Sequence, residues 1–187
     1  MTQLATAHTF AELLALPDDG KIYELVRGEF VEKPMGRRSV GTASEIQITL
    51  GGFVKANRLG SIATELPINC FPWLGNHGRR PDVCFFDWQR LPEGFASDEH
   101  VTVAPNWVAE VLSEHDNAID VDEKLEEYLQ AGVELIWIVN PAVRTVRVHR
   151  ADGSVAFYHE ADTIDGGTVF PNFRAKVHDL FPQPMSK

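Results

Sequence analysis

Two nearly continuous apolar segments, separated by one amphipathic helix, constrain the fold of this chain more than any other feature. Residues 106–113 and 134–140 consist mainly of Trp, Val, Ala, Leu and Ile. Short apolar runs of this kind predict strands buried in a sheet. The segment 120–131 between them has helical periodicity and is followed by Gly132, a common helix terminator. Interleaved strands and helices therefore predict an α/β fold with a mixed central sheet.

The remaining segments agree with this fold class. Thr9 is a typical N-cap for a short helix, and Arg27-Gly28 and Asp152-Gly153 are typical of hairpin turns. The predicted helices are residues 10–16, 39–58 and 120–131, and the predicted strands are 21–26, 29–32, 61–66, 68–73, 83–88, 106–113, 134–140, 145–150 and 155–159. No linker or repeat divides the chain, so we expect a single domain over residues 1–187.

The long predicted helix contains one unusual pair, Gly51-Gly52. Two glycines cost a helix about 1–2 kcal/mol relative to alanine. We therefore expect close packing against this part of the helix.

Composition limits the location and the partners of the protein. No apolar run approaches transmembrane length, and the first residues lack the basic and apolar regions of a signal peptide. We therefore expect a cytoplasmic protein with no membrane partner. The two cysteines, Cys70 and Cys84, have no companion histidine spacing that would indicate zinc.

The net charge of −10 argues against a general nucleic-acid-binding surface. The charge is unevenly distributed, however: residues 27–81 carry a net charge of +4, and residues 82–187 carry −11. Arginines scattered over a solvated surface would explain this bias, but a local phosphate-binding surface remains compatible with it.

Two carboxylates stand within apolar strand-like segments. Asp82 follows Pro81 in Arg80-Pro81-Asp82-Val83, and Glu110 interrupts the apolar run 106–113. A buried carboxylate without a partner costs several kcal/mol or becomes protonated. Glu110 therefore needs a metal ion, a basic side chain or backbone donors, and either a structural ion pair or a metal site would satisfy it.

Lys124 lies at the margin of the apolar face of the helix that follows Glu110, whereas Asp120, Glu123, Glu126 and Glu127 are expected on the other side. A lysine here could pair with its acidic neighbours. It could equally stabilise charge beside two carboxylates that hold a hard cation such as Mg²⁺.

Several segments, taken in order, resemble the Uma-type restriction endonuclease family, a branch of the PD-(D/E)XK nuclease superfamily. They are Tyr23-Glu24-Leu25-Val26-Arg27-Gly28-Glu29, Pro81-Asp82-Val83, Glu110-Val111-Leu112-Ser113 and Lys124–Val133 followed by Trp137–Pro141. The resemblance covers roughly residues 9–181. It implies a restriction-endonuclease-like core, with a central mixed sheet flanked by helices.

The resemblance also implies residue roles. Asp82 matches the first metal-binding acid of the superfamily, Glu110 the second and Lys124 the lysine that this family places on the next helix. Glu24 matches the acid in the family's first hairpin and would be a further ligand of Mg²⁺ or Mn²⁺, directly or through water. Val40 stands where family members often carry histidine. Glu45 on the same helix could supply a carboxylate, although a solvated helix residue is the commoner explanation for it.

Three functional hypotheses follow. The first is a divalent-metal-dependent DNA endonuclease that acts as a homodimer. The second is a catalytically silent relative that binds nucleic acid or another protein, which the acidic charge and Val40 favour. The third, a β-barrel that binds sugars or metabolites, does not explain why the helix with Lys124 directly follows Glu110.

Overall fold

A six-stranded mixed sheet forms the centre of the computed structural model, which describes residues 7–34, 36–91 and 101–183. Its strand order is β3-β4-β5-β6-β7-β8. The strands are β3 (Gly60–Thr64), β4 (Val83–Asp87), β5 (Trp107–Val111), β6 (Leu135–Asn140), β7 (Thr145–Arg150) and β8 (Val155–His159). β5 and β6 are parallel, and the other neighbours are antiparallel. This confirms the predicted α/β class with a mixed sheet.

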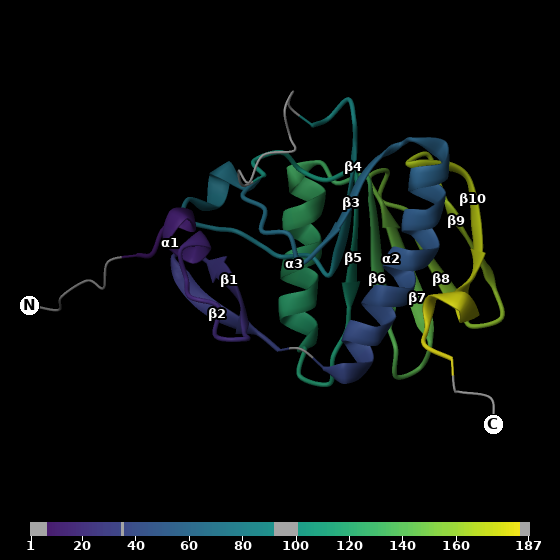
Figure 1. The fold of residues 1–187 in the computed structure, drawn as a ribbon, viewed down its shortest axis with the longest axis horizontal. Coiled ribbons are helices and arrows are strands. Elements are labelled where there is room, and N and C mark those ends of the chain that lie inside the picture. Colours follow the sequence, from purple (N-terminus) through teal and green to yellow (C-terminus); the bar gives the residue numbers. More distant parts are fainter. Residues whose placement is uncertain (1–6, 35, 92–100, 184–187) are drawn as a thin grey trace, which may run out of the picture.

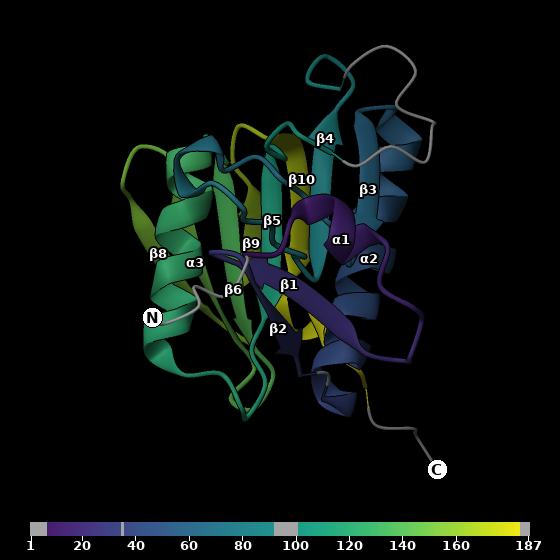
Figure 2. The same ribbon diagram turned by 90° about the vertical axis from the view of Figure 1, so that its left-hand side faces the viewer.

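Two helices cover opposite faces of this sheet (Figures 1 and 2). Helix α2 (Arg37–Asn57) packs its buried residues, such as Leu50, against Phe85 and Trp107. Helix α3 (Ala118–Ala131) packs Tyr128 against the opposite face, together with Val108. Alternation along β4 and β5 separates the two faces, because successive side chains of a strand point in opposite directions.

Smaller elements complete the structure. These are α1 (Phe10–Leu14), the hairpin of β1 (Ile22–Val26) and β2 (Glu29–Lys33), the pair β9 (Thr163–Gly166) and β10 (Phe170–Lys176), and two 3-10 turns at Pro72–Leu74 and Val177–Leu180. Thr9 caps α1, as its sequence predicts, and the structure adds a capping box with Glu12. In Figure 2 the β1–β2 hairpin lies between α3 and α2. This hairpin therefore places residues 22–33 beside both covering helices.

Three local predictions differ from the structure. The predicted strand 68–73 is wrong: Ile68 makes only isolated bridges, and a 3-10 turn begins at Pro72, because proline cannot donate to a strand ladder. The strands β9 and β10 were not predicted, because their sequences carry several Gly, Asp and Pro residues. The predicted strand 83–88 is one residue too long: β4 ends at Asp87, and Trp88 lies just beyond it and is 57% exposed.

The prediction for the glycine pair in α2 is half correct. A Cβ at Gly51 would meet Ile62 Cγ2 at 3.4 Å, so this glycine does face a close neighbour. A Cβ at Gly52 would meet nothing within 4 Å.

In the described part of the chain, no helix is long and apolar enough to cross a membrane.

Candidate active site

Strands β4 and β5 place two carboxylates opposite each other. The strands are antiparallel, and Val83 pairs with Ala109. Extending this register by one residue places Asp82 opposite Glu110. Both residues are buried, at 8% and 7% exposure, and both line one hollow of about 650 Å³. The structure thus brings together the two acids that the sequence singled out.

One oxygen of each acid is held by a donor from the protein. Asp82 Oδ2 accepts a hydrogen bond from the backbone N–H of Val111 at 2.5 Å. Glu110 Oε1 accepts one from the Tyr128 hydroxyl at 2.7 Å. These bonds fix the orientation of both carboxylates, so that the second oxygen of each is available to a cation.

Lys33, the last residue of β2, supplies the cation beside Asp82. Its Nζ donates hydrogen bonds to both carboxylate oxygens of Glu65, at 3.1 and 3.0 Å, and to the Arg80 carbonyl at 2.6 Å. It also forms an ion pair with Asp82 Oδ1 at 2.9 Å. An ammonium has three donors, and the hydrogen bonds to Glu65 and the Arg80 carbonyl use all of them. The sequence analysis missed both Lys33 and Glu65. The hairpin strand with Lys33 is largely exposed and has no apolar alternation that would mark one buried lysine.

Lys124 supplies the cation beside Glu110. Its Nζ lies 3.1 Å from Glu24 Oε1 and 3.7 Å from Glu110 Oε2. Among the described residues, Lys124 makes only the hydrogen bond to Glu24, so it is held more loosely than Lys33. Its place at the margin of the apolar face of α3 agrees with the helical wheel. Its catalytic role stays a prediction.

Glu24 belongs to this cluster through its basic partners. Its carboxylate pairs with Arg79 at 3.0 Å and accepts the backbone N–H of Arg80 at 3.1 Å, in addition to the bond from Lys124. The Lys124 ammonium therefore lies between Glu24 and Glu110. Glu24 anchors that lysine, and its predicted role as a metal ligand stays a prediction.

Glu127 is buried, and its predicted position on the polar side of α3 is wrong. It accepts two hydrogen bonds from Arg79, at 2.7 and 3.0 Å, and a third contact from His77 Nε2 at 3.1 Å. His77 Nδ1 accepts the backbone N–H of Arg27, so a neutral His77 carries its proton on Nε2. The segment with His77 and Arg79 covers this flank of α3, which the periodicity of the helix alone does not reveal.

The two acids beside Lys124 differ in how completely their negative charge is compensated. Burial would raise the pKa of Glu24, but Lys124 and Arg79 outweigh it and hold that pKa at about 2. Burial raises the pKa of Glu110 in spite of Lys124 and Lys33. Burial would lower the pKa of Lys124, but Glu110 and Glu24 raise it. The ionised form of Glu110 is therefore incompletely compensated and would gain from an additional cation.

The donor set fits a hard divalent cation that needs few protein ligands. No group of three or more His, Cys, Asp or Glu residues in the described ranges is arranged to hold a metal. Mg²⁺ commonly takes only one or two carboxylates and completes its shell with water and phosphate. Asp82 and Glu110 provide such a pair, and within the described part of the chain Glu110 Oε2 has only the 3.7 Å contact with Lys124.

Helix α2 forms one wall of the hollow. Val40, Ser44 and Gln47 line it, and Val40 is 45% exposed. The position where the family resemblance suggests histidine therefore faces the acids' hollow with an apolar side chain. Glu45 is absent from this wall as the structure describes it.

A second hollow, of about 1030 Å³, adjoins the first and shares Ser39, His115 and Asp116 with it. Four arginines line the second hollow: Arg37, Arg38, Arg144 and Arg147. Phosphate groups are commonly bound by such arginines. Three acidic residues, Glu114, Asp116 and Asp122, line the same hollow. Only Arg37 and Arg38 belong to the basic segment 27–81, and a phosphate-binding surface there stays a prediction.

Comparisons with known proteins give the family. The family model described as Uma2, "Putative restriction endonuclease", matches residues 10–178. A solved structure with similar fold is described as the crystal structure of a putative nuclease belonging to DUF820 from Anabaena variabilis ATCC 29413. It superposes with a TM-score of 0.77 at 25% sequence identity, over 92% of this chain and 97% of that one. No curated protein matches the chain significantly.

Glu65 provides a test of the electrostatics. Burial and the neighbouring Asp82 raise its pKa to about 7 in spite of Lys33. A raised pKa stabilises the fold below the unfolded value of about 4.5, and this contribution is lost as the pH rises through 7. Glutamine does not titrate, so we predict that the stability of Glu65→Gln relative to the wild type increases as the pH rises from 4.5 to 7, measured by urea unfolding. A stability difference that is constant over this range would contradict the raised pKa of Glu65.

Proposed function

The chain belongs to the Uma2 family, and from this premise we propose that it is a Mg²⁺- or Mn²⁺-dependent endonuclease that hydrolyses phosphodiester bonds in DNA. One observation carries the proposal. Asp82 and Glu110 lie opposite each other on β4 and β5, each with one oxygen fixed by the protein and the other toward an ammonium group. The two carboxylates are thus a preorganised pair of ligands, and without a metal ion their negative charge is balanced by the ammonium groups of Lys33 and Lys124.

Asp82 and Glu110 would hold the cation. A bound divalent ion lowers the pKa of a water molecule and neutralises charge on the phosphate that is attacked. The protein contributes orientation: Val111 N–H and the Tyr128 hydroxyl keep the two carboxylates from rotating. Glu24 stays ionised at neutral pH, because Lys124 and Arg79 hold its pKa at about 2, and it keeps the ammonium of Lys124 near Glu110.

The two lysines have different proposed roles. Lys124 has donors left over and can turn to a phosphate oxygen as negative charge develops there. Lys33 donates all its hydrogen bonds to Glu65 and the Arg80 carbonyl, and it serves as a positioning residue that holds Asp82 in place through their ion pair. Lys124 is therefore the proposed catalytic lysine.

The neighbouring arginines support a nucleic-acid substrate. Arg37, Arg38 and Arg147 line the second hollow, which adjoins the acidic one at Ser39 and also includes Glu114, Asp116 and Asp122. Phosphates that flank the reacting bond would bind there.

We further propose that the protein is a cytoplasmic homodimer. Cleavage of both DNA strands needs two sites, and two-fold dimers are the commonest oligomers. A monomer in light scattering would contradict this assembly.

One observation favours a second candidate. Val40 faces the hollow with an apolar side chain where the family resemblance suggests histidine. A catalytically silent relative that binds nucleic acid or a protein partner would tolerate this change. Such a protein would bind its partner without cleaving DNA.

The activity itself is tested with supercoiled plasmid DNA and Mg²⁺ or Mn²⁺. We predict cleavage by the wild type and a loss of about 10²-fold or more in Asp82→Asn and Glu110→Gln, because each removes a charged ligand. The exposed Glu29→Gln on β2 is the matched control and should keep full activity. A wild-type protein that cuts neither DNA nor RNA with either metal would favour the silent relative.

The lysines are distinguished by methionine substitutions, which keep the apolar stem. We predict that Lys124→Met folds with modest loss of stability, because Glu24 keeps its ion pair with Arg79 and Glu110 keeps its hydrogen bond from Tyr128. The variant should lose turnover by about 10²-fold or more. Lys33→Met should instead lose about 3–5 kcal/mol of unfolding free energy, since it leaves buried carboxylates unpaired. Lys21→Met, on the exposed side of the same hairpin, is the control. A Lys124→Met protein as active as the wild type would remove Lys124 from the site.

A further inference from the structure

One face of α2 continues beyond the acidic hollow. Residues at successive spacings of three and four share this face: Val40, Ser44, Gln47, Gly51, Lys55 and Arg58. The first half of the series lines the acidic hollow, and the second half lines another depression at the far end of the helix. The helix thus offers one continuous wall about 30 Å long.

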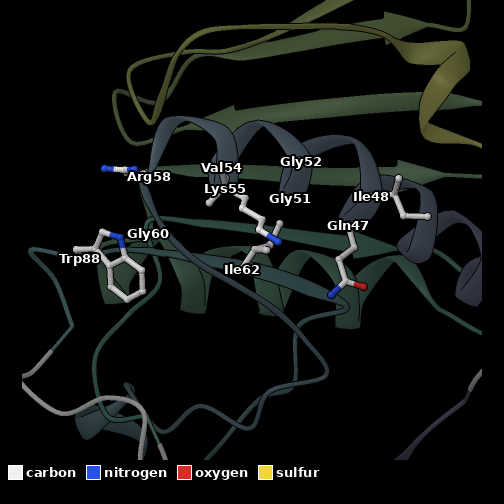
Figure 3. A pocket seen from close by; sticks show the side chains of 10 residues that line it. All are labelled: Gln47, Ile48, Gly51, Gly52, Val54, Lys55, Arg58, Gly60, Ile62 and Trp88. Atoms are coloured by element: carbon white, nitrogen blue, oxygen red, sulfur yellow. The ribbon is translucent and has the colours of Figure 1, made fainter.

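The second depression, here called the lateral groove, has a volume of about 670 Å³. Its wall from α2 includes Gln47, Gly52, Lys55 and Arg58, and its other side includes Ile62 on β3 and Trp88 after β4. In Figure 3 Trp88 lies at one end and Gln47 at the other, with the Lys55 side chain between them. Gln47 lines both the lateral groove and the acidic hollow, so the two adjoin at this residue.

The charge of the lateral groove is opposite to that of the protein. The chain has a net charge of −10. None of the described residues that line the groove is acidic, whereas Lys55 and Arg58 are exposed cations. A polyanion would be attracted to this groove and repelled by most of the remaining surface.

The groove also offers an exposed aromatic ring. Trp88 is 57% exposed, and it lines the groove together with Ile62 and Gly52. Proteins that bind single strands combine cations for the phosphates with aromatic side chains on which bases stack. In duplex DNA the bases already stack on each other, so a ring in this position suits an unpaired strand.

We propose that the lateral groove binds an unpaired nucleic-acid strand that continues from the acidic site along α2. Its bases stack on Trp88, and its phosphates contact Lys55 and Arg58. This inference rests on the proposed nuclease function and specifies its substrate: DNA with a single-stranded segment beside the bond that is cut.

A second copy of the chain is a poorer occupant of the groove. A two-fold contact would place the same surface on both sides. Lys55 and Arg58 of each copy would then face a groove wall without an acidic residue among its described members. Like charges in such a contact cost affinity.

Binding is measured without catalysis, with a fluorescein-labelled oligothymidylate in EDTA, by fluorescence anisotropy of the full chain. We expect Trp88→Ala to weaken binding about tenfold or more. The logarithm of the binding constant falls as the logarithm of the salt concentration rises, and Lys55→Gln and Arg58→Gln should each make this slope shallower by about 0.7. Arg174→Gln, an exposed cation outside the groove, should leave binding and slope unchanged.

A matched pair of variants isolates the charge of the groove. A Cβ at Gly52 meets nothing within 4 Å, so both Gly52→Glu and Gly52→Gln should fold. We expect the Glu variant to bind the oligothymidylate several-fold more weakly than the Gln variant. Equal binding by the two, or oligothymidylate binding that is indifferent to Trp88→Ala, overturns the proposal. So does light scattering in which Trp88→Ala dissociates a dimer while oligothymidylate binding is unchanged. Because EDTA prevents cleavage, a protein that binds through the groove but cuts nothing contradicts only the nuclease function.

Discussion

The site depends on the mutual neutralisation of buried charges. Glu24, Asp82 and Glu110 are each at most 8% exposed, and burial of an unpaired carboxylate costs several kcal/mol. Lys33 and Lys124 provide the compensating charge. These groups come from the first hairpin, β4, β5 and α3, so segments up to 100 residues apart must meet for any of them to be stable. The ion pairs therefore fix the position of the β1–β2 hairpin against the sheet.

The same neutralisation prepares the site for chemistry. Each of the two central carboxylates has one oxygen fixed by a neutral donor, the Val111 N–H or the Tyr128 hydroxyl. The other oxygen faces an ammonium group that a stronger cation could replace. The tighter pair, Lys33 with Asp82, preserves the geometry, whereas the looser pair, Lys124 with Glu110, leaves Glu110 incompletely compensated. Structural support and reactivity are thus divided between two lysines.

The sequence predicted the sheet and the central acids because both produce strong local patterns. Apolar runs mark β5 and β6, and a charged residue inside such a run, such as Glu110, can be recognised from the sequence as buried. Lys33 and Glu65 lie in segments without a buried pattern, and their roles arise only from contact with Asp82. Glu127 was placed wrongly for a related reason: the helical wheel of α3 cannot show that Arg79 and His77 cover its flank. Local periodicity predicts burial against the main sheet but not burial beneath a distant loop.

The central claim is that Asp82 and Glu110 form a ligand pair for a hard divalent cation. A crystal soaked in Mn²⁺ and measured at the manganese absorption edge tests it most directly. The account predicts an anomalous peak between the two carboxylates, within about 2.0–2.3 Å of an oxygen from each, with the Lys124 ammonium displaced from Glu110. A soaked crystal without an anomalous peak at these carboxylates, and with Lys33 and Lys124 still paired to them, would contradict it.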